Sequence, residues 1–314
     1  MLFYCLHERI SRIESSIKHN RNGFVLPYIL YYCAMKLHSI ETGRFRLDGG
    51  AMFGVVPKLL WNRTNPADEN NRIHMAARCL LIETENKLIL IDNGIGNKYD
   101  AKFASNYAID QDTTLEASLQ AHGFGLNDIT DMILTHLHFD HCGGSTVWAD
   151  PGVKAKPAFP NAVYHVQKSH LDWALHPNPR EKASFLKDNI EPLVASGQFN
   201  LLEGERNFLP GIDLKVVFGH TEAQQLPLIE YKGHKILFSA DLFPTTGHLP
   251  LPYVMGYDVR PLITLEERGE FLKTAVEEKW LIYYEHDPIN ELSFVTLTEK
   301  GSYTAGETLR LSDL

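Results

Sequence analysis

The chain has 314 residues, of which 44% are hydrophobic, and its formal net charge is −9. A chain of this size can bury a large core, and one α/β sandwich accounts for it without a second catalytic domain. The negative charge and the absence of a Lys/Arg-rich block argue against a nucleic-acid partner, because binding to a phosphate backbone needs clustered cations.

Residues 1–34 match no motif found later in the chain. Their apolar stretch, Phe24–Ala34, is short and is broken by Pro27. A membrane span needs about 20 apolar residues, and a secretory signal begins with a compact basic segment, so neither is predicted here. We therefore expect an N-terminal extension over 1–34, one folded domain over 35–314, and no membrane partner.

The four cysteines show no C-x-x-C spacing; they are Cys5, Cys33, Cys79 and Cys142. Disulfide frameworks belong to small secreted scaffolds, so we expect a reducing, cytoplasmic setting.

Two segments precede the main motif. The loop Arg46–Pro57 contains three glycines together with the apolar residues Met52, Phe53 and Val56. Such a loop either packs into the core or forms an apolar wall of a substrate pocket. The segment Lys87–Gly94 is typical of a buried strand that ends in a sharp glycine turn.

The most informative motif follows the apolar run Met132–Leu134 and reads His136, His138, Asp140, His141. Side chains alternate along an extended chain, so His136 and His138 face the same way and can share one metal ion. Asp140 and His141 are adjacent and diverge, which suits a second ion beside the first.

The segment 151–200 interrupts the pattern of strands. Its helical stretches predict a helical insertion, which could cap the site and bring Trp173 against a substrate; helix packing is the other interpretation for Trp173. His165, His170 and His176 match no strand end, so we do not expect them to bind metal.

Three later strands each end in one candidate ligand. The apolar runs 214–218, 235–238 and 280–284 are followed by His220, Asp241 and His286. Two ions held by imidazole and carboxylate need these additional ligands, with one position left open for water in a catalytic site.

The ordered set from His136 to His286 resembles the metallo-β-lactamase superfamily, and within it the N-acyl-homoserine lactonases. The strand and helix order also suits an α/β, four-layer αββα sandwich. The resemblance implies two divalent ions, with zinc as first choice and manganese, iron or cobalt as alternatives. It assigns the first ion to His136, His138 and His220, the second to Asp140, His141 and His286, the bridge between them to Asp241, and support from behind to Asp92.

The resemblance predicts hydrolysis by a metal-activated hydroxide, with Asp140 and Asp241 as the catalytic carboxylates. A carboxylate at Asp241 in place of a thiol argues against the true β-lactamase branch. The chain departs from the lactonase pattern at Pro244, where that pattern has a tyrosine that supplies an oxyanion donor. Tyr253 and Tyr257 are the candidate replacements, although packing suits their apolar surroundings as well.

A small lactone or ester is the first choice of substrate. The alternatives are an organophosphate, a thioester of the glyoxalase II kind, or a non-enzymatic protein in which metal only stabilises the fold. A homodimer is left open.

Overall fold

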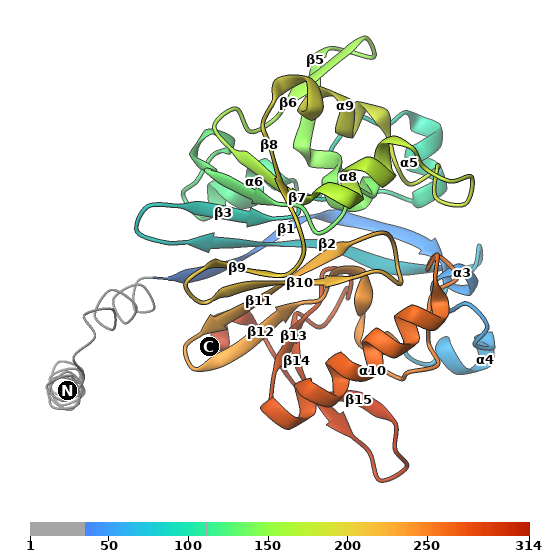
Figure 1. The fold of residues 1–314 in the computed structure, drawn as a ribbon. Coiled ribbons are helices and arrows are strands. Elements are labelled where there is room, and N and C mark those ends of the chain that lie inside the picture. Colours follow the sequence, from blue (N-terminus) through green and yellow to red (C-terminus); the bar gives the residue numbers. More distant parts are fainter. Residues whose placement is uncertain (1–34, 111) are drawn as a thin grey trace, which may run out of the picture.

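Two β-sheets packed face to face form the centre of the protein, and helices cover their outer faces (Figure 1). The computed structural model describes residues 35–110 and 112–314, so the extension expected over 1–34 lies outside the described residues. The arrangement of helices, sheet, sheet and helix confirms the predicted α/β, four-layer αββα sandwich.

The first sheet has six strands in the order β1-β2-β3-β4-β7-β8. The pairs β1/β2 and β2/β3 are antiparallel, whereas β3/β4, β4/β7 and β7/β8 are parallel. The strands are β1 (Lys36–Asp48), β2 (Arg72–Glu83), β3 (Leu88–Ile91), β4 (Asp131–Ile133), β7 (Val163–Gln167) and β8 (Phe199–Leu202).

The second sheet has seven strands in the order β15-β14-β13-β12-β11-β10-β9, and its one parallel pair is β12/β13. Its strands are β9 (Arg206–Leu209), β10 (Ile212–Val217), β11 (Gln224–Tyr231), β12 (His234–Phe238), β13 (Leu281–Tyr283), β14 (Leu292–Leu297) and β15 (Tyr303–Leu309). A separate hairpin joins β5 (Thr146–Asp150) to β6 (Lys154–Pro157).

Helices α5, α6, α8 and α9 lie on the side of the first sheet, and α10 lies on the side of the second (Figure 1). The α-helices are α3 (Gly49–Phe53), α4 (Lys58–Trp61), α5 (Ala101–Tyr107), α6 (Leu115–Ala121), α7 (Phe139–Cys142), α8 (Lys168–Leu175), α9 (Lys187–Ser196) and α10 (Pro261–Glu278). Short 3₁₀ turns are η1 (Leu126–Asp128), η2 (Gly143–Ser145), η3 (Ala240–Leu242), η4 (Thr246–His248) and η5 (Leu311–Asp313).

The central strands are apolar on both faces because both faces are buried. In β3, Ile89 and Ile91 enter the core between the two sheets, while Leu90 enters the core beneath the helices. Successive side chains of a strand point to opposite faces, so a strand covered on both sides reads as a continuous apolar run. The same rule explains β4, which leads directly into the metal motif.

Residues 151–200 are only partly helical. Helices α8 and α9 occur there as expected, but the same segment also supplies β7 and β8 to the first sheet. These strands were not predicted from the sequence, because β7 is short and runs directly into α8. The segment is therefore part of the sandwich and is not an insertion outside it.

Among the helices of the described chain, none combines the length and the apolar character needed to cross a lipid bilayer.

Candidate metal centre and pocket

The metal motif lies where β4 leaves the first sheet. Leu137 points into the core beneath the helices and is fully buried, so its neighbours His136 and His138 point the opposite way, as the alternation rule predicts. The chain then turns into α7, which carries Asp140 and His141. Cys142 donates its Sγ hydrogen to the Leu137 carbonyl at 3.3 Å and is a buried packing residue.

The other candidate ligands come from the carboxyl ends of strands in the second sheet. His220 follows β10, Asp241 lies in η3 after β12, and His286 follows β13. Gly219 lets this edge approach α10, because a Cβ at that position would lie 2.3 Å from the backbone nitrogen of Thr264. The folded chain thus brings ligands from both sheets to one point.

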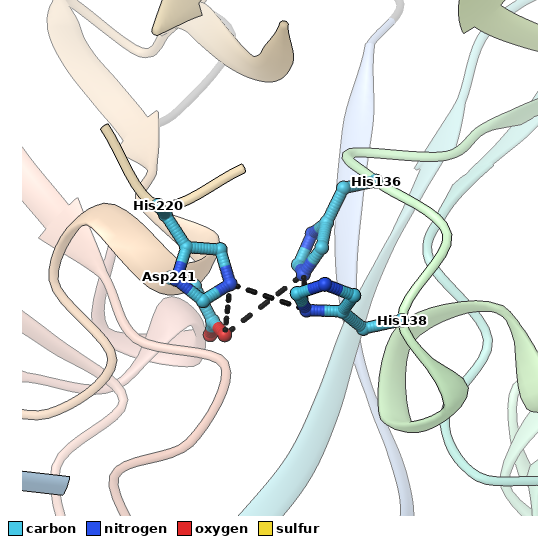
Figure 2. Close-up of side chains that lie close together, drawn as sticks. All are labelled: His136, His138, His220 and Asp241. Carbon is cyan, nitrogen blue, oxygen red and sulfur yellow. Dashed lines mark hydrogen bonds and ion pairs between the residues drawn. The ribbon is translucent and has the colours of Figure 1, made fainter. Parts of the chain in front are cut away.

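A first set consists of His136, His138, His220 and Asp241, whose ligand atoms all lie within 4.8 Å of one another (Figure 2). Nε2 of His136 is 3.0 Å from Nδ1 of His138, which is 3.2 Å from Nε2 of His220. All four side chains are buried.

A second set consists of Asp140, His141 and His286, again with ligand atoms within 4.8 Å. Asp241 lies between the sets. Its Oδ2 is 3.1 Å from Nε2 of His220, and its Oδ1 is 3.1 Å from Nε2 of His286. This is the placement expected of a carboxylate that bridges two ions.

The donor set fits divalent cations. Imidazole nitrogens that face one another at 3.0–3.2 Å cannot all donate hydrogen bonds, so several lone pairs converge on the same space. Oδ1 of Asp241 is buried and receives no hydrogen bond from any described residue. Buried groups of this kind are rarely left without a partner, and two cations would satisfy them.

The pKa values of these groups agree with that interpretation. Burial and the neighbouring imidazoles hold the pKa of His136 well below its usual range, which keeps its ring neutral. Against the lowering effect of burial, Asp241 and Asp258 raise the pKa of His220 to about 10. In the protein without metal a proton therefore occupies His220, and a divalent ion would take the place of that proton.

Buried carboxylates contact two of the histidines at the ring nitrogen that faces away from the cluster. Glu181 places Oε1 3.3 Å from Nε2 of His138, and Asp258 places Oδ1 2.9 Å from Nδ1 of His220. Each contact directs the other ring nitrogen toward the cluster. Glu181 and Asp258 were not predicted from the sequence, since neither follows a strand or belongs to a spaced motif.

Two carboxylates support His141. Asp92 adopts a left-handed φ of 55° and accepts hydrogen bonds from the backbone nitrogen and hydroxyl of Thr135 at 2.8 and 2.6 Å. Its Oδ2 lies 3.1 Å from Nδ1 of His141, and Oε2 of Glu285 lies 3.0 Å from the same nitrogen. Burial and the nearby Asp92 charge raise the pKa of Glu285 to about 8.

The turn that follows His220 makes hydrogen bonds of its own. Thr221 donates to Glu181 at 2.7 Å, and the Glu222 carbonyl contacts Nδ1 of His170 at 2.5 Å. His170 also accepts a hydrogen bond from the Leu137 backbone at 2.8 Å, which ties this turn to the metal loop. His170 belongs to neither ligand set, as expected.

A cavity of about 300 Å³ opens onto the cluster. The candidate ligands in its wall are His138, Asp140, His220, Asp241 and His286. The rest of the wall is mainly apolar and aromatic, with Leu47, Met52, Met75, Tyr107, Phe139, Met255 and Tyr257, and it also includes the polar residues Arg180, Glu181 and Ser184.

Of the six possible pocket residues, Met52 and Tyr257 line this cavity, and the other four take the packing role that was the alternative interpretation. Phe53 is fully buried and stacks between Trp61 and His248, Val56 packs in the same cluster, and Tyr253 meets the Phe53 ring edge-on. Trp173 donates its indole Nε1 to Glu181 and lies behind the cavity wall. The glycine-rich loop therefore serves both as core and as pocket wall.

The metallo-beta-lactamase superfamily pattern matches residues 75–286, which is more than half of the chain, and the chain belongs to this superfamily. Its class is that of the metal-dependent hydrolases. An N-acyl homoserine lactonase from Bacillus cereus is 24% identical over 265 residues, covering 80% of this chain and 93% of that relative.

Solved structures of other hydrolases have a similar fold. A probable metal-dependent hydrolase from Staphylococcus aureus has a TM-score of 0.78 and 30% identity, covering 88% of this chain and 99% of that chain. AidC, a dizinc quorum-quenching lactonase in complex with a product, has a TM-score of 0.72 at 23% identity, covering 88% and 96%. At that identity AidC shows a common fold.

Proposed function

We propose that this metallo-hydrolase opens a small, largely apolar lactone or ester of the N-acyl-homoserine-lactone kind. The observation that carries the proposal is the position of Asp241, whose two oxygens face two histidine sets at the base of an apolar cavity. The lactonases among the relatives support the choice of substrate.

His136, His138 and His220 would hold the first ion, Asp140, His141 and His286 would hold the second, and Asp241 lies where it could serve both. Two such ions, with zinc as first choice, would supply the chemistry of an activated water at neutral pH and of a polarised bond in the substrate.

The remaining chemistry belongs to the chain. Asp140 lies in the cavity wall, with Oδ2 3.8 Å from Nε2 of His286, where it can accept the proton released during hydrolysis. Met52, Met75 and Met255 give the cavity an apolar surface that suits an acyl tail and excludes water. Such a wall does not suit a charged phosphodiester.

Two alternatives come from the same site. An organophosphate or a thioester would be attacked by the same hydroxide, so the fold and ligands do not distinguish them. A purely structural metal site is disfavoured, because His138, Asp140, His220, Asp241 and His286 all border the open cavity, whereas structural metal sites are closed. The cytoplasmic setting and a homodimer stay predictions.

The test is hydrolysis by purified protein whose zinc content has been measured. Acyl-homoserine lactones of increasing chain length, a phosphotriester and a thioester are compared on one preparation. We expect the lactones to turn over and KM to fall as the tail lengthens, since each buried CH₂ contributes up to ~0.8 kcal/mol. If the phosphotriester or the thioester is hydrolysed and the lactones are not, the lactone assignment is rejected and the assignment as a metal-dependent hydrolase is retained.

A further inference from the structure

Two tyrosines, Tyr107 and Tyr257, line the cavity together with Asp140. Tyr107 is the last residue of α5, and Tyr257 lies in the turn before α10, so they come from distant parts of the chain. Both line the cavity, and neither hydroxyl has a hydrogen-bond partner within the described part of the chain. A phenol that borders a pocket and is unpaired there is available to a ligand.

Ring packing holds Tyr107 in place, and a backbone hydrogen bond holds the turn that carries Tyr257. Tyr107 lies against Phe139, the residue just before Asp140, with ring centroids 5.0 Å apart, and against Phe103 at 4.6 Å. The turn before Tyr257 is tied down by Gly256, whose nitrogen donates to the Ala51 carbonyl at 2.8 Å. Two hydroxyls on fixed supports are preorganised, which is what stabilisation of a developing charge requires.

Both hydroxyls remain donors at neutral pH. Burial raises the pKa of Tyr107, and the Asp140 charge raises it further. The pKa of Tyr257 is raised by burial, by Tyr107 and by the acidic side chains Asp48 and Asp140.

Arg180 is another donor in the cavity wall, and it is less suited to this role. The guanidinium of Arg180 already donates to the main-chain carbonyls of Gly256 and Asp258. Pro244, at the position of the lactonase tyrosine, has no donor at all, and its carbonyl accepts from the His286 backbone at 3.2 Å. Hydrolysis places negative charge on the carbonyl oxygen, and a hydrogen-bond donor in the cavity would add to the stabilisation that the metal ions would supply.

We propose that Tyr107 and Tyr257 donate hydrogen bonds to the substrate oxygen on which negative charge develops. The inference rests on the proposed function for its substrate, and it assigns to Tyr107 a catalytic role that the sequence motifs did not suggest. The two phenols would replace the donor that Pro244 lacks.

The test uses zinc-loaded Tyr107→Phe, Tyr257→Phe and the double variant, which remove only the hydroxyl oxygens. Tyr99→Phe is the matched control, because Tyr99 stacks on Phe103 at 5.9 Å but does not line the cavity. We expect kcat to fall by up to ~10²-fold in the single variants, with little change in KM, zinc content or Tm. The control should keep its kcat.

A second measurement does not depend on lactone turnover. Inorganic phosphate, a tetrahedral oxyanion, is titrated calorimetrically into the wild type, the double variant and Tyr99→Phe. We expect the double variant to bind phosphate at least about tenfold more weakly than the other two, because it loses two donors and the loss of even one hydrogen bond to a charged group weakens binding by about that factor. If the double variant binds phosphate as tightly as the wild type, or if the wild type does not bind phosphate, the proposal that Tyr107 and Tyr257 act as donors is wrong. If the lactones are not hydrolysed but the double variant binds phosphate more weakly, the proposed substrate is rejected and the proposed role of the two tyrosines is retained.

Discussion

The indole Nε1 of Trp173 donates a 2.7 Å hydrogen bond to Oε2 of Glu181, while the other oxygen of Glu181 lies 3.3 Å from His138. Asn178 and Thr221 also donate to this carboxylate, at 2.8 and 2.7 Å. Trp173 thus acts on the candidate metal centre through Glu181, which it helps to hold in position, and not through contact with a substrate.

Glu181→Gln should weaken zinc binding by about 10- to 100-fold, because the orientation of His138 depends on the carboxylate behind it. A competition titration against a zinc indicator measures this. Glu191→Gln is the matched control, since Glu191 lies on α9 with its side chain 58% exposed. If both variants bind zinc as the wild type does, Glu181 does not position a ligand.

Asp241→Ala should lose both ions, because one carboxylate faces both histidine sets. Elemental analysis of the wild type should give about two divalent ions per chain, and hydrolysis should vanish in the variant. Asp172→Asn serves as control, since its side chain is 60% exposed on α8. One ion or none in unchelated wild-type protein contradicts the dinuclear assignment.

Met52→Ala should change substrate preference, whereas Phe53→Ala should lower stability. Met52 lines the cavity, so its truncation should reduce the dependence of KM on acyl-chain length. Phe53 stacks on His248 at 4.3 Å and on Trp61 at 5.3 Å, so its truncation should lower the free energy of unfolding by about 3–5 kcal/mol. Chain-length kinetics and chemical denaturation separate the two effects. A Phe53 variant of full stability with altered chain-length preference would show that Phe53 contacts the substrate after all.

Asp131 should make stability depend on acid pH. Although burial opposes the shift, His165 and Lys87 hold the pKa of Asp131 well below its usual range. The charged form is therefore favoured by folding, and this stabilisation is present above the ordinary aspartate pKa of 3.8 and is lost as the pH falls toward the lower pKa of the folded protein. In EDTA-treated protein, Asp131→Asn should lower the free energy of unfolding by about 2 kcal/mol at pH 6 and by less at pH 3. A difference that is constant across this range would show that the charge of Asp131 is not responsible.

Several features followed from local sequence patterns. The period-2 alternation placed His136 and His138 on one side and Leu137 on the other, and strands do precede His220, Asp241 and His286. Other features had no local signal. Glu181 lies in the connection between α8 and α9, Asp258 lies before α10, and Tyr107 ends a short helix, so nothing in their neighbours indicates what they contact.

Local patterns in the sequence, together with the family resemblance, were enough to predict the α/β sandwich and a candidate ligand set, because strand periodicity and ligand spacing depend on residues close together in the chain. Only the tertiary structure decided which side chains support those ligands and which line the cavity. Met52 and Phe53 show the physical reason, since they are adjacent on one helix and yet Met52 borders the cavity while Phe53 packs between Trp61 and His248. Which of two neighbouring apolar residues meets the cavity depends on what the rest of the chain packs against each of them.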